Sequence, residues 1–201
     1  MKNLTTTAII LGHKNFGQYD KLIFLYTEEL GKIKTIAKGS RKITSKFTGH
    51  LETMNLVEVS LYFGPKNIIL TEIITKKTLK EIRGSLEKIT EILEIAKMTN
   101  QMVFEKQKLK DLTKLIEATI EQFKTTRKPR QIKQGYQIKL LDKMGLIPDF
   151  RSIETKIDIK YLKFLNFLKE SPLSEIEKIK LEKEEEINTN KIIEKILSQI
   201  I

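Results

Sequence analysis

Short runs of β-branched and other apolar residues dominate the first 80 positions of the chain. Within 56–63, apolar residues alternate with polar or aromatic ones, which is the two-residue period of a half-buried strand. Runs rich in β-branched residues predict strands over 6–12, 22–27, 33–38, 56–63 and 68–75. Five short antiparallel strands in about 80 residues predict a small closed barrel.

The predicted barrel core consists of the apolar residues that recur along these strands. They are Ile9, Leu11, Ile23, Leu25, Ile33, Val57, Val59, Leu61, Ile69 and Ile73.

After residue 80, apolar residues recur three and four positions apart, which is the period of amphipathic helices. The predicted helical faces are Leu86, Ile89, Leu93 and Ala96, then 109–123, then 132–144, then 159–168. Gly145 is placed to cap the third helix. Ser171-Pro172 introduces a short fifth segment, and Asn188 or Thr189 is expected to cap a last helix. These faces most simply pack on one another as a bundle.

Taken together, the two patterns predict an α+β chain of two domains. Residues 1–80 are expected to form a five-stranded OB-fold β-barrel, because that is a common small barrel that binds nucleic acid. Residues 81–201 are expected to form an all-α helical bundle.

The charge of the chain favours a polyanionic partner. Its formal net charge is +11, and the positive excess is denser before residue 80 (13 basic against 6 acidic residues) than after it (24 against 20). A general bias toward lysine would not produce this uneven distribution, so nucleic acid is the favoured ligand. The chain has no cysteine, which excludes disulfides and thiolate metal sites. It shows no signal peptide and no apolar run long enough to span a bilayer, so we expect a cytoplasmic, nucleoid-associated protein without membrane contact.

The segment 38–49 is the strongest candidate site. It follows a predicted strand and contains the four cations Lys38, Arg41, Lys42 and Lys46 but no acid. Each cation can approach a phosphate, and arginine can do so with two parallel hydrogen bonds. The sequence therefore predicts a flexible basic loop that binds a nucleic-acid backbone largely without reading bases.

Further residues near this loop extend the candidate interface. Lys32 and Lys34 in the preceding strand add positive charge. The candidate aromatic platforms for stacking bases are Phe47, Tyr62, Phe16 and Tyr19, of which Phe47 and Tyr62 are favoured. Core packing is the favoured role of Phe63 and Phe16.

Enzymatic chemistry is not expected. The chain has no phosphate-binding loop motif and no His-Glu-x-x-His element, and its two histidines, His13 and His50, lie far apart in sequence. Asp20 is more simply a backbone cap than a catalytic acid, and the run 183–186 is more simply a solvated charged face. No cofactor and no metal site are predicted.

Several short elements, taken in order, make the chain resemble the RecO family of bacterial recombination mediators. They are Ile10-Leu11, Phe16-Gly17, Asp20, Thr27, Gly31-Lys32-Ile33, Ala37 to Lys42, Ser45-Lys46, Gly49, Leu51-Glu52, Thr71-Glu72, Leu140-Leu141 and Gly145 to Asp149. The chain differs from many members in lacking a four-cysteine zinc module after the Pro-Asp element, and in having Gln18 at a usually acidic position.

The resemblance implies an N-terminal OB-fold followed by a helical domain. It implies binding of single- and double-stranded DNA, annealing of complementary strands, and help in loading RecA. It also implies two protein partners, RecR and the acidic C-terminal tail of single-stranded DNA-binding protein. The basic cluster Lys124, Arg127, Lys128 and Arg130 is a candidate for attracting that tail.

Three other functions remain open from the residues alone. An RNA-binding OB-fold protein would have the same barrel and charge, and competition between DNA and RNA would separate the two. A scaffold that binds only proteins would retain no DNA on a filter. A nuclease would need a cluster of metal-binding carboxylates, which the spacing does not show.

Overall fold

A computed structural model describes residues 3–147 and 158–200 of the chain. The chain forms two compact units, Met1–Thr113 and Lys114–Ile201. The first unit contains the predicted strands and one long helix, and the second unit is helical. The predicted order of strands followed by helices is therefore confirmed.

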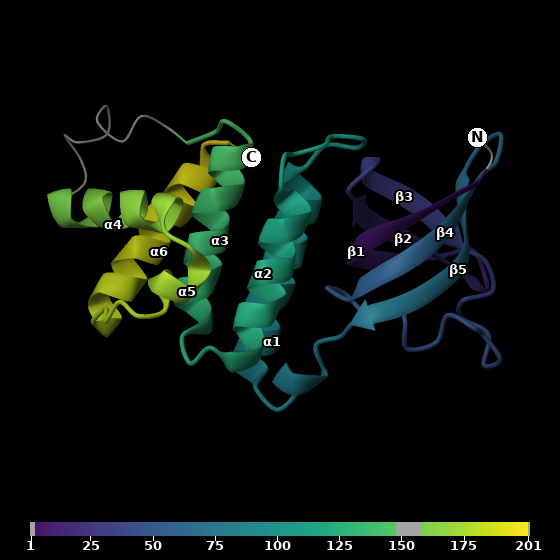
Figure 1. Ribbon diagram of the computed structural model, residues 1–201, viewed down its shortest axis with the longest axis horizontal. Coiled ribbons are helices and arrows are strands. Elements are labelled where there is room, and N and C mark those ends of the chain that lie inside the picture. Colours follow the sequence, from purple (N-terminus) through teal and green to yellow (C-terminus); the bar gives the residue numbers. More distant parts are fainter. Residues whose placement is uncertain (1–2, 148–157, 201) are drawn as a thin grey trace. The chain divides into compact units, whose positions relative to one another are not determined.

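The five predicted strands are present and close into a barrel (Figure 1). They are β1 (Asn3–Phe16), β2 (Asp20–Thr27), β3 (Gly31–Ala37), β4 (Leu56–Phe63) and β5 (Ile68–Lys77). Their order around the barrel is β1-β2-β3-β5-β4. All neighbouring pairs are antiparallel except β3 and β5, which close the barrel as a parallel pair with Ile36 opposite Ile69.

Strand β1 is long and pairs with its two neighbours mostly through different halves of its length. Its first half pairs with β4 and its second half with β2, and the register with β2 shifts between Ile10 and Gly12. A bulge of this kind bends a strand and increases its twist. The bend lets one strand contribute to both sides of a small barrel.

The barrel core is mostly the predicted one, with differences on β1 and β5. The side chains of Ala8 and Ile10 belong to the core cluster of the barrel, as does Leu70 on β5. Ile9 and Leu11 are also buried, but they lie outside this cluster, and Ile69 is only partly buried. Because helix α1 (Leu86–Met102) packs against β1, that strand is buried on both faces and loses its alternation.

Helix α1 begins at a serine cap, with the Lys88 amide donating to Ser85 Oγ at 3.3 Å. A short 3-10 helix, η1 (Lys80–Ile82), precedes it. The buried face of α1 includes Ile92, Ile95, Ala96 and Thr99. The predicted face was wrong at Leu86 and Leu93, which are 81% and 44% exposed.

The second unit contains all but the first two residues of α2 (Leu112–Thr125), and α3 (Pro129–Lys143), α4 (Ile159–Glu170), α5 (Leu173–Ile176) and α6 (Lys183–Ser198). Helices α4, α5 and α6 all contact α3. Polar side chains of α3 bind the carbonyl oxygens near the ends of its neighbours: Gln131 Nε2 donates to the Ile176 oxygen at 2.6 Å, and Lys139 Nζ to the Lys169 oxygen at 2.8 Å. Burial lowers the pKa of Lys139, and the carbonyl partially replaces its lost hydration.

Gly145 ends α3, as predicted. Its φ of 68° lies in the left-handed region, and the amides of Gly145 and Leu146 each donate at 2.9 Å to the carbonyls of Asp142 and Leu141. This pair of hydrogen bonds is the Schellman motif. It favours glycine at position 145 because a residue with a Cβ is strained at a positive φ. The Pro148-Asp149 element of the sequence lies outside the described residues.

The last helix begins six or seven residues earlier than predicted, at Lys183 rather than after Asn188 or Thr189. The run 183–186 forms its first turn, and Glu185 accepts the Glu182 amide at 3.1 Å. Acidic residues are favourable there because helix N-termini carry partial positive charge.

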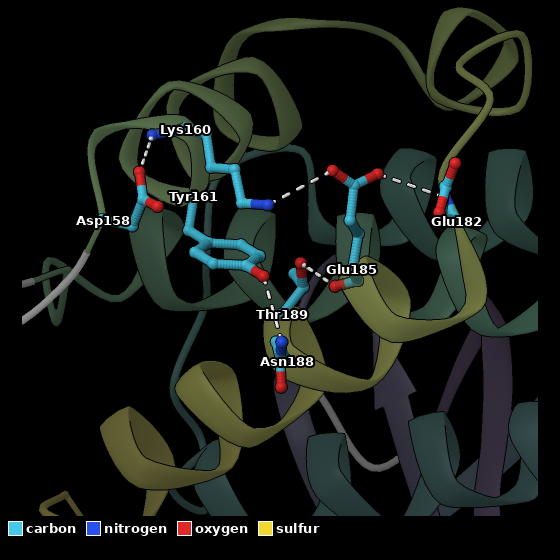
Figure 2. A network of polar contacts seen from close by, with 7 residues as sticks. All are labelled: Asp158, Lys160, Tyr161, Glu182, Glu185, Asn188 and Thr189. Atoms are coloured by element: carbon cyan, nitrogen blue, oxygen red, sulfur yellow. Dashed lines mark hydrogen bonds and ion pairs between the residues drawn. The ribbon is translucent and has the colours of Figure 1, made fainter.

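The side chains expected to cap this helix instead lie within it, in a polar network with α4 (Figure 2). Asn188 donates to the Tyr161 hydroxyl at 3.0 Å, and Thr189 Oγ1 donates to the Glu185 carbonyl at 2.8 Å. Lys160 Nζ lies 3.5 Å from Glu185 Oε1. The network holds the start of α4 against α6.

Candidate nucleic-acid interface

The basic loop connects β3 to β4 and places its cations in solvent. Lys38, Arg41, Lys42 and Lys46 are all exposed. Among the described residues, none of the four forms an ion pair with an acid. Exposed cations without acidic partners produce a positive field that attracts phosphates.

The loop is a series of turns rather than the flexible arm expected from the sequence. Backbone hydrogen bonds join Lys42 to Gly39, Ser45 to Lys42, and Thr48 to Ser45, with N···O distances of 3.0–3.3 Å. The Phe47 and Leu51 side chains belong to the barrel core cluster. Two buried side chains therefore fix the far half of the loop to the barrel.

The first half of the loop is bonded to the turn between β1 and β2. The Gly39 amide donates to Asp20 Oδ1 at 2.7 Å, and the Arg41 amide donates to the Tyr19 carbonyl at 2.9 Å. The Arg41 guanidinium donates to the Gln18 carbonyl at 3.1 Å. The structure thus brings together two segments, 18–20 and 39–41, that are separate in the sequence.

The aromatic residues are distributed differently from the prediction. Phe47 is only 4% exposed, so its ring is not available for stacking in this structure. Tyr62 is 38% exposed, while Phe16 at the end of β1 and Tyr19 in the β1–β2 turn are 46% and 47% exposed. Lys42 Nζ lies 5.4 Å from the centre of the Tyr19 ring, a cation–π distance. Phe16 was expected in the core, and its exposure corrects that expectation.

Lys32 is buried rather than presented to solvent. It is 9% exposed, and its ammonium donates to the carbonyl oxygens of Asn100 and Val103 near the end of α1, the latter at 2.6 Å. Burial lowers the pKa of Lys32. Lys34 is exposed and pairs with Glu105 at 2.8 Å. Both lysines therefore contact the segment that follows α1, and neither is an unpaired cation.

We expect Lys32→Met to destabilise the first unit by about 1–3 kcal/mol, because one buried and one partly buried carbonyl lose their charged donor. Lys34→Met is the matched control, and loss of its exposed ion pair is expected to reduce stability by less than about 1 kcal/mol. Urea unfolding followed by circular dichroism measures both. Unchanged stability in Lys32→Met, together with weakened DNA binding, would instead make Lys32 a DNA contact.

The proposed tail-binding cations are partly engaged within the second unit. Lys124 Nζ lies 3.2 Å from Glu121, and Lys128 Nζ donates to the carbonyls of Glu177 and Ile179 at 2.8 and 2.5 Å. Arg127 and Arg130 have exposed side chains. Lys128 therefore has an internal role that the sequence did not indicate.

Two general features of the described residues bear on function. None of the helices in the described ranges is long and apolar enough to cross a membrane. Across those ranges, no group of three or more histidine, aspartate or glutamate side chains is arranged to hold a metal ion.

Comparison with known proteins gives consistent matches. The model of the family described as "Recombination protein O N terminal" matches residues 1–82, which contain the barrel. The chain is 28% identical over 170 residues to the "DNA repair protein RecO" of Acetivibrio thermocellus, covering 82% of this chain and 68% of that protein. It is 31% identical over 146 residues to the protein of that name in Dehalococcoides mccartyi, covering 73% and 58%.

A third relative of the same name, from Syntrophobacter fumaroxidans, is 29% identical over 154 residues, covering 74% of this chain and 59% of the relative. The chain therefore spans between 58% and 68% of the length of these three relatives.

Proposed function

Because the chain belongs to the RecO family, we propose that it binds DNA in recombinational repair, through the barrel and its basic loop. The observation that supports this most strongly is the exposure of Lys38, Arg41, Lys42 and Lys46 without acidic partners among the described residues. The relatives' names connect them with DNA repair.

The proposed interface combines the four cations with two aromatic side chains, Phe16 at the end of β1 and Tyr19 in the β1–β2 turn. The cations neutralise phosphates, and Phe16 and Tyr19 offer exposed ring faces on which bases can stack. Tyr62 on β4 is a further candidate. These contacts involve backbone phosphates and ring faces, so they are largely independent of base sequence. The barrel is accordingly an OB-fold in our proposal, with residues 1–80 as the DNA-binding domain.

Charge neutralisation also explains how such a protein could anneal strands. Two single strands repel each other through their phosphates. A basic surface that binds both backbones lowers that repulsion and leaves base edges free to pair. We therefore propose that the chain anneals complementary single strands, as well as binding duplex DNA.

The wider role that we propose is that of a non-enzymatic mediator that helps RecA load onto single strands coated with single-stranded DNA-binding protein. RecR and the acidic tail of that binding protein are the proposed partners. Arg127 and Arg130 are the exposed members of the cluster proposed to attract the tail.

An annealing assay tests this function. Complementary strands are coated with single-stranded DNA-binding protein, either intact or lacking its acidic tail, and duplex formation is followed by fluorescence. We expect the chain to accelerate annealing of strands coated with the intact protein, and to do so less when the tail is removed. No acceleration in either case would contradict annealing, and equal acceleration would contradict the tail as a partner.

A further inference from the structure

A carboxylate side chain accepts a backbone hydrogen bond from the start of the basic loop. Asp20, the first residue of β2, accepts the Gly39 amide at 2.7 Å, across a sequence separation of 19 residues. Beyond Gly39, the Arg41 amide donates to the Tyr19 carbonyl at 2.9 Å and its guanidinium to the Gln18 carbonyl at 3.1 Å. The two Arg41 contacts use backbone oxygens of the turn, so Asp20 provides the only side-chain acceptor among these three contacts.

The charge of Asp20 is unfavourable for the proposed ligand. A carboxylate bonded to a phosphate-binding loop repels phosphates, so charge alone predicts that its removal would strengthen DNA binding. A positioning role predicts the opposite result when the acceptor oxygen is removed. The sign of the effect therefore separates the two roles.

We infer that Asp20 is a positioning residue of the DNA interface, an inference that rests on the proposed function. By binding the Gly39 amide, Asp20 fixes where the loop leaves β3. It thereby positions Arg41 and Lys42 against the β1–β2 turn. Lys42 then lies 5.4 Å from the Tyr19 ring centre, and cations and exposed aromatic rings form one surface. A loop that is ordered before binding loses less conformational entropy when DNA binds.

Two substitutions separate position from charge. Asp20→Asn removes the charge and keeps an oxygen acceptor for the Gly39 amide, whereas Asp20→Ala removes both. Affinity for a fluorescein-labelled oligothymidylate is measured by anisotropy at low salt. We expect Asp20→Asn to bind as tightly as the unsubstituted chain or tighter, and Asp20→Ala to bind about tenfold more weakly. Equal affinity of the two variants, or tighter binding by Asp20→Ala, would overturn the inference.

Limited trypsin digestion without DNA gives a second readout. We expect cleavage after Lys38, Arg41 and Lys42 to be about tenfold faster in Asp20→Ala than in Asp20→Asn. A loop released from the β1–β2 turn fits the active site of the protease more easily. Cleavage after Lys97, inside α1, reports unfolding of the same unit and is expected to stay unchanged. Equal rates in the two variants, or a parallel rise at Lys97, would overturn the inference.

The digestion distinguishes failure of this inference from failure of the proposed function. If the unsubstituted chain does not bind DNA but its loop is released by Asp20→Ala, Asp20 positions the loop and the DNA-binding function is wrong. If the chain binds DNA and Asp20→Ala changes neither cleavage nor affinity, the function stands and the role of Asp20 is wrong.

Discussion

Replacing Lys38, Lys42 and Lys46 together by glutamine is expected to weaken binding to single-stranded DNA by about 100-fold at low salt, at roughly 1 kcal/mol per lost cation–phosphate contact. The side chains keep similar length and polarity, so the barrel is expected to stay folded. Each lost contact also removes about 0.7 from the slope of log affinity against log salt concentration, so the slope is expected to flatten by about 2. Fluorescence anisotropy across a salt series measures both quantities.

A variant with the same change in net charge provides the control. Lys163, Lys180 and Lys191 are exposed lysines of the second unit, and their replacement by glutamine also removes three positive charges. If the loop binds phosphates, this control variant is expected to lose less than about threefold in affinity, through the weaker long-range field alone. Equal losses in the two variants would show that net charge, rather than the loop, determines binding.

Replacing Gly31 by alanine is expected to destabilise the first unit by about 2–4 kcal/mol. Gly31 has a φ of 67°, which strains any residue with a Cβ, and a Cβ there would lie 2.2 Å from the Gln107 backbone oxygen. Backbone atoms cannot rotate away as a side-chain end can, so the segment after α1 would have to move. The contacts of Lys32 and Lys34 with that segment would be disturbed as well.

Gly84→Ala is the matched control for this substitution. Gly84 does not have a positive φ, and a Cβ at this position would meet no heavy atom within 4 Å. We expect its effect to lie within about 0.5 kcal/mol, as for most surface substitutions. Urea unfolding followed by circular dichroism measures both variants. A Gly31→Ala variant as stable as Gly84→Ala would contradict the close packing of Gly31 against Gln107.

Strand β4 was the most predictable because it follows a simple two-residue period. On β4, burial alternates along 57–61, and the predicted bounds 56–63 are those of the structure. Strand β1 was less predictable because α1 covers its second face, so that Ile9 and Ile10 are both buried. A period argument assumes that one face meets solvent, and it fails where two elements enclose a strand.

The α-helices in the described ranges were predictable, but not at every end. The last helix was placed too late because Asn188 and Thr189 are common capping residues, whereas the observed start lies in the acidic run at Glu182–Glu185. An acidic run is typical both of a solvated surface and of a helix N-terminus. The hydrogen bond from the Glu182 amide to the Glu185 carboxylate identifies the helix N-terminus.

The cations of the loop were predictable from sequence, but their surroundings were not. Charge density marks Lys38, Arg41, Lys42 and Lys46 directly. Two features depend on where the loop returns to the barrel: the burial of Phe47 and the contact of Asp20 with Gly39. Local sequence patterns carry no information about such long-range contacts. A phenylalanine among lysines is equally compatible with stacking on a base and with anchoring a loop.

The most direct test of the proposed function is the salt dependence of binding by the unsubstituted chain to matched DNA and RNA oligonucleotides. We expect DNA affinity to fall linearly on a log-log plot, with a slope of about −2 to −3 for three or four phosphates contacted on a single strand. No detectable DNA binding at low salt, or a clear preference for RNA of the same sequence, would contradict a DNA-binding basic loop.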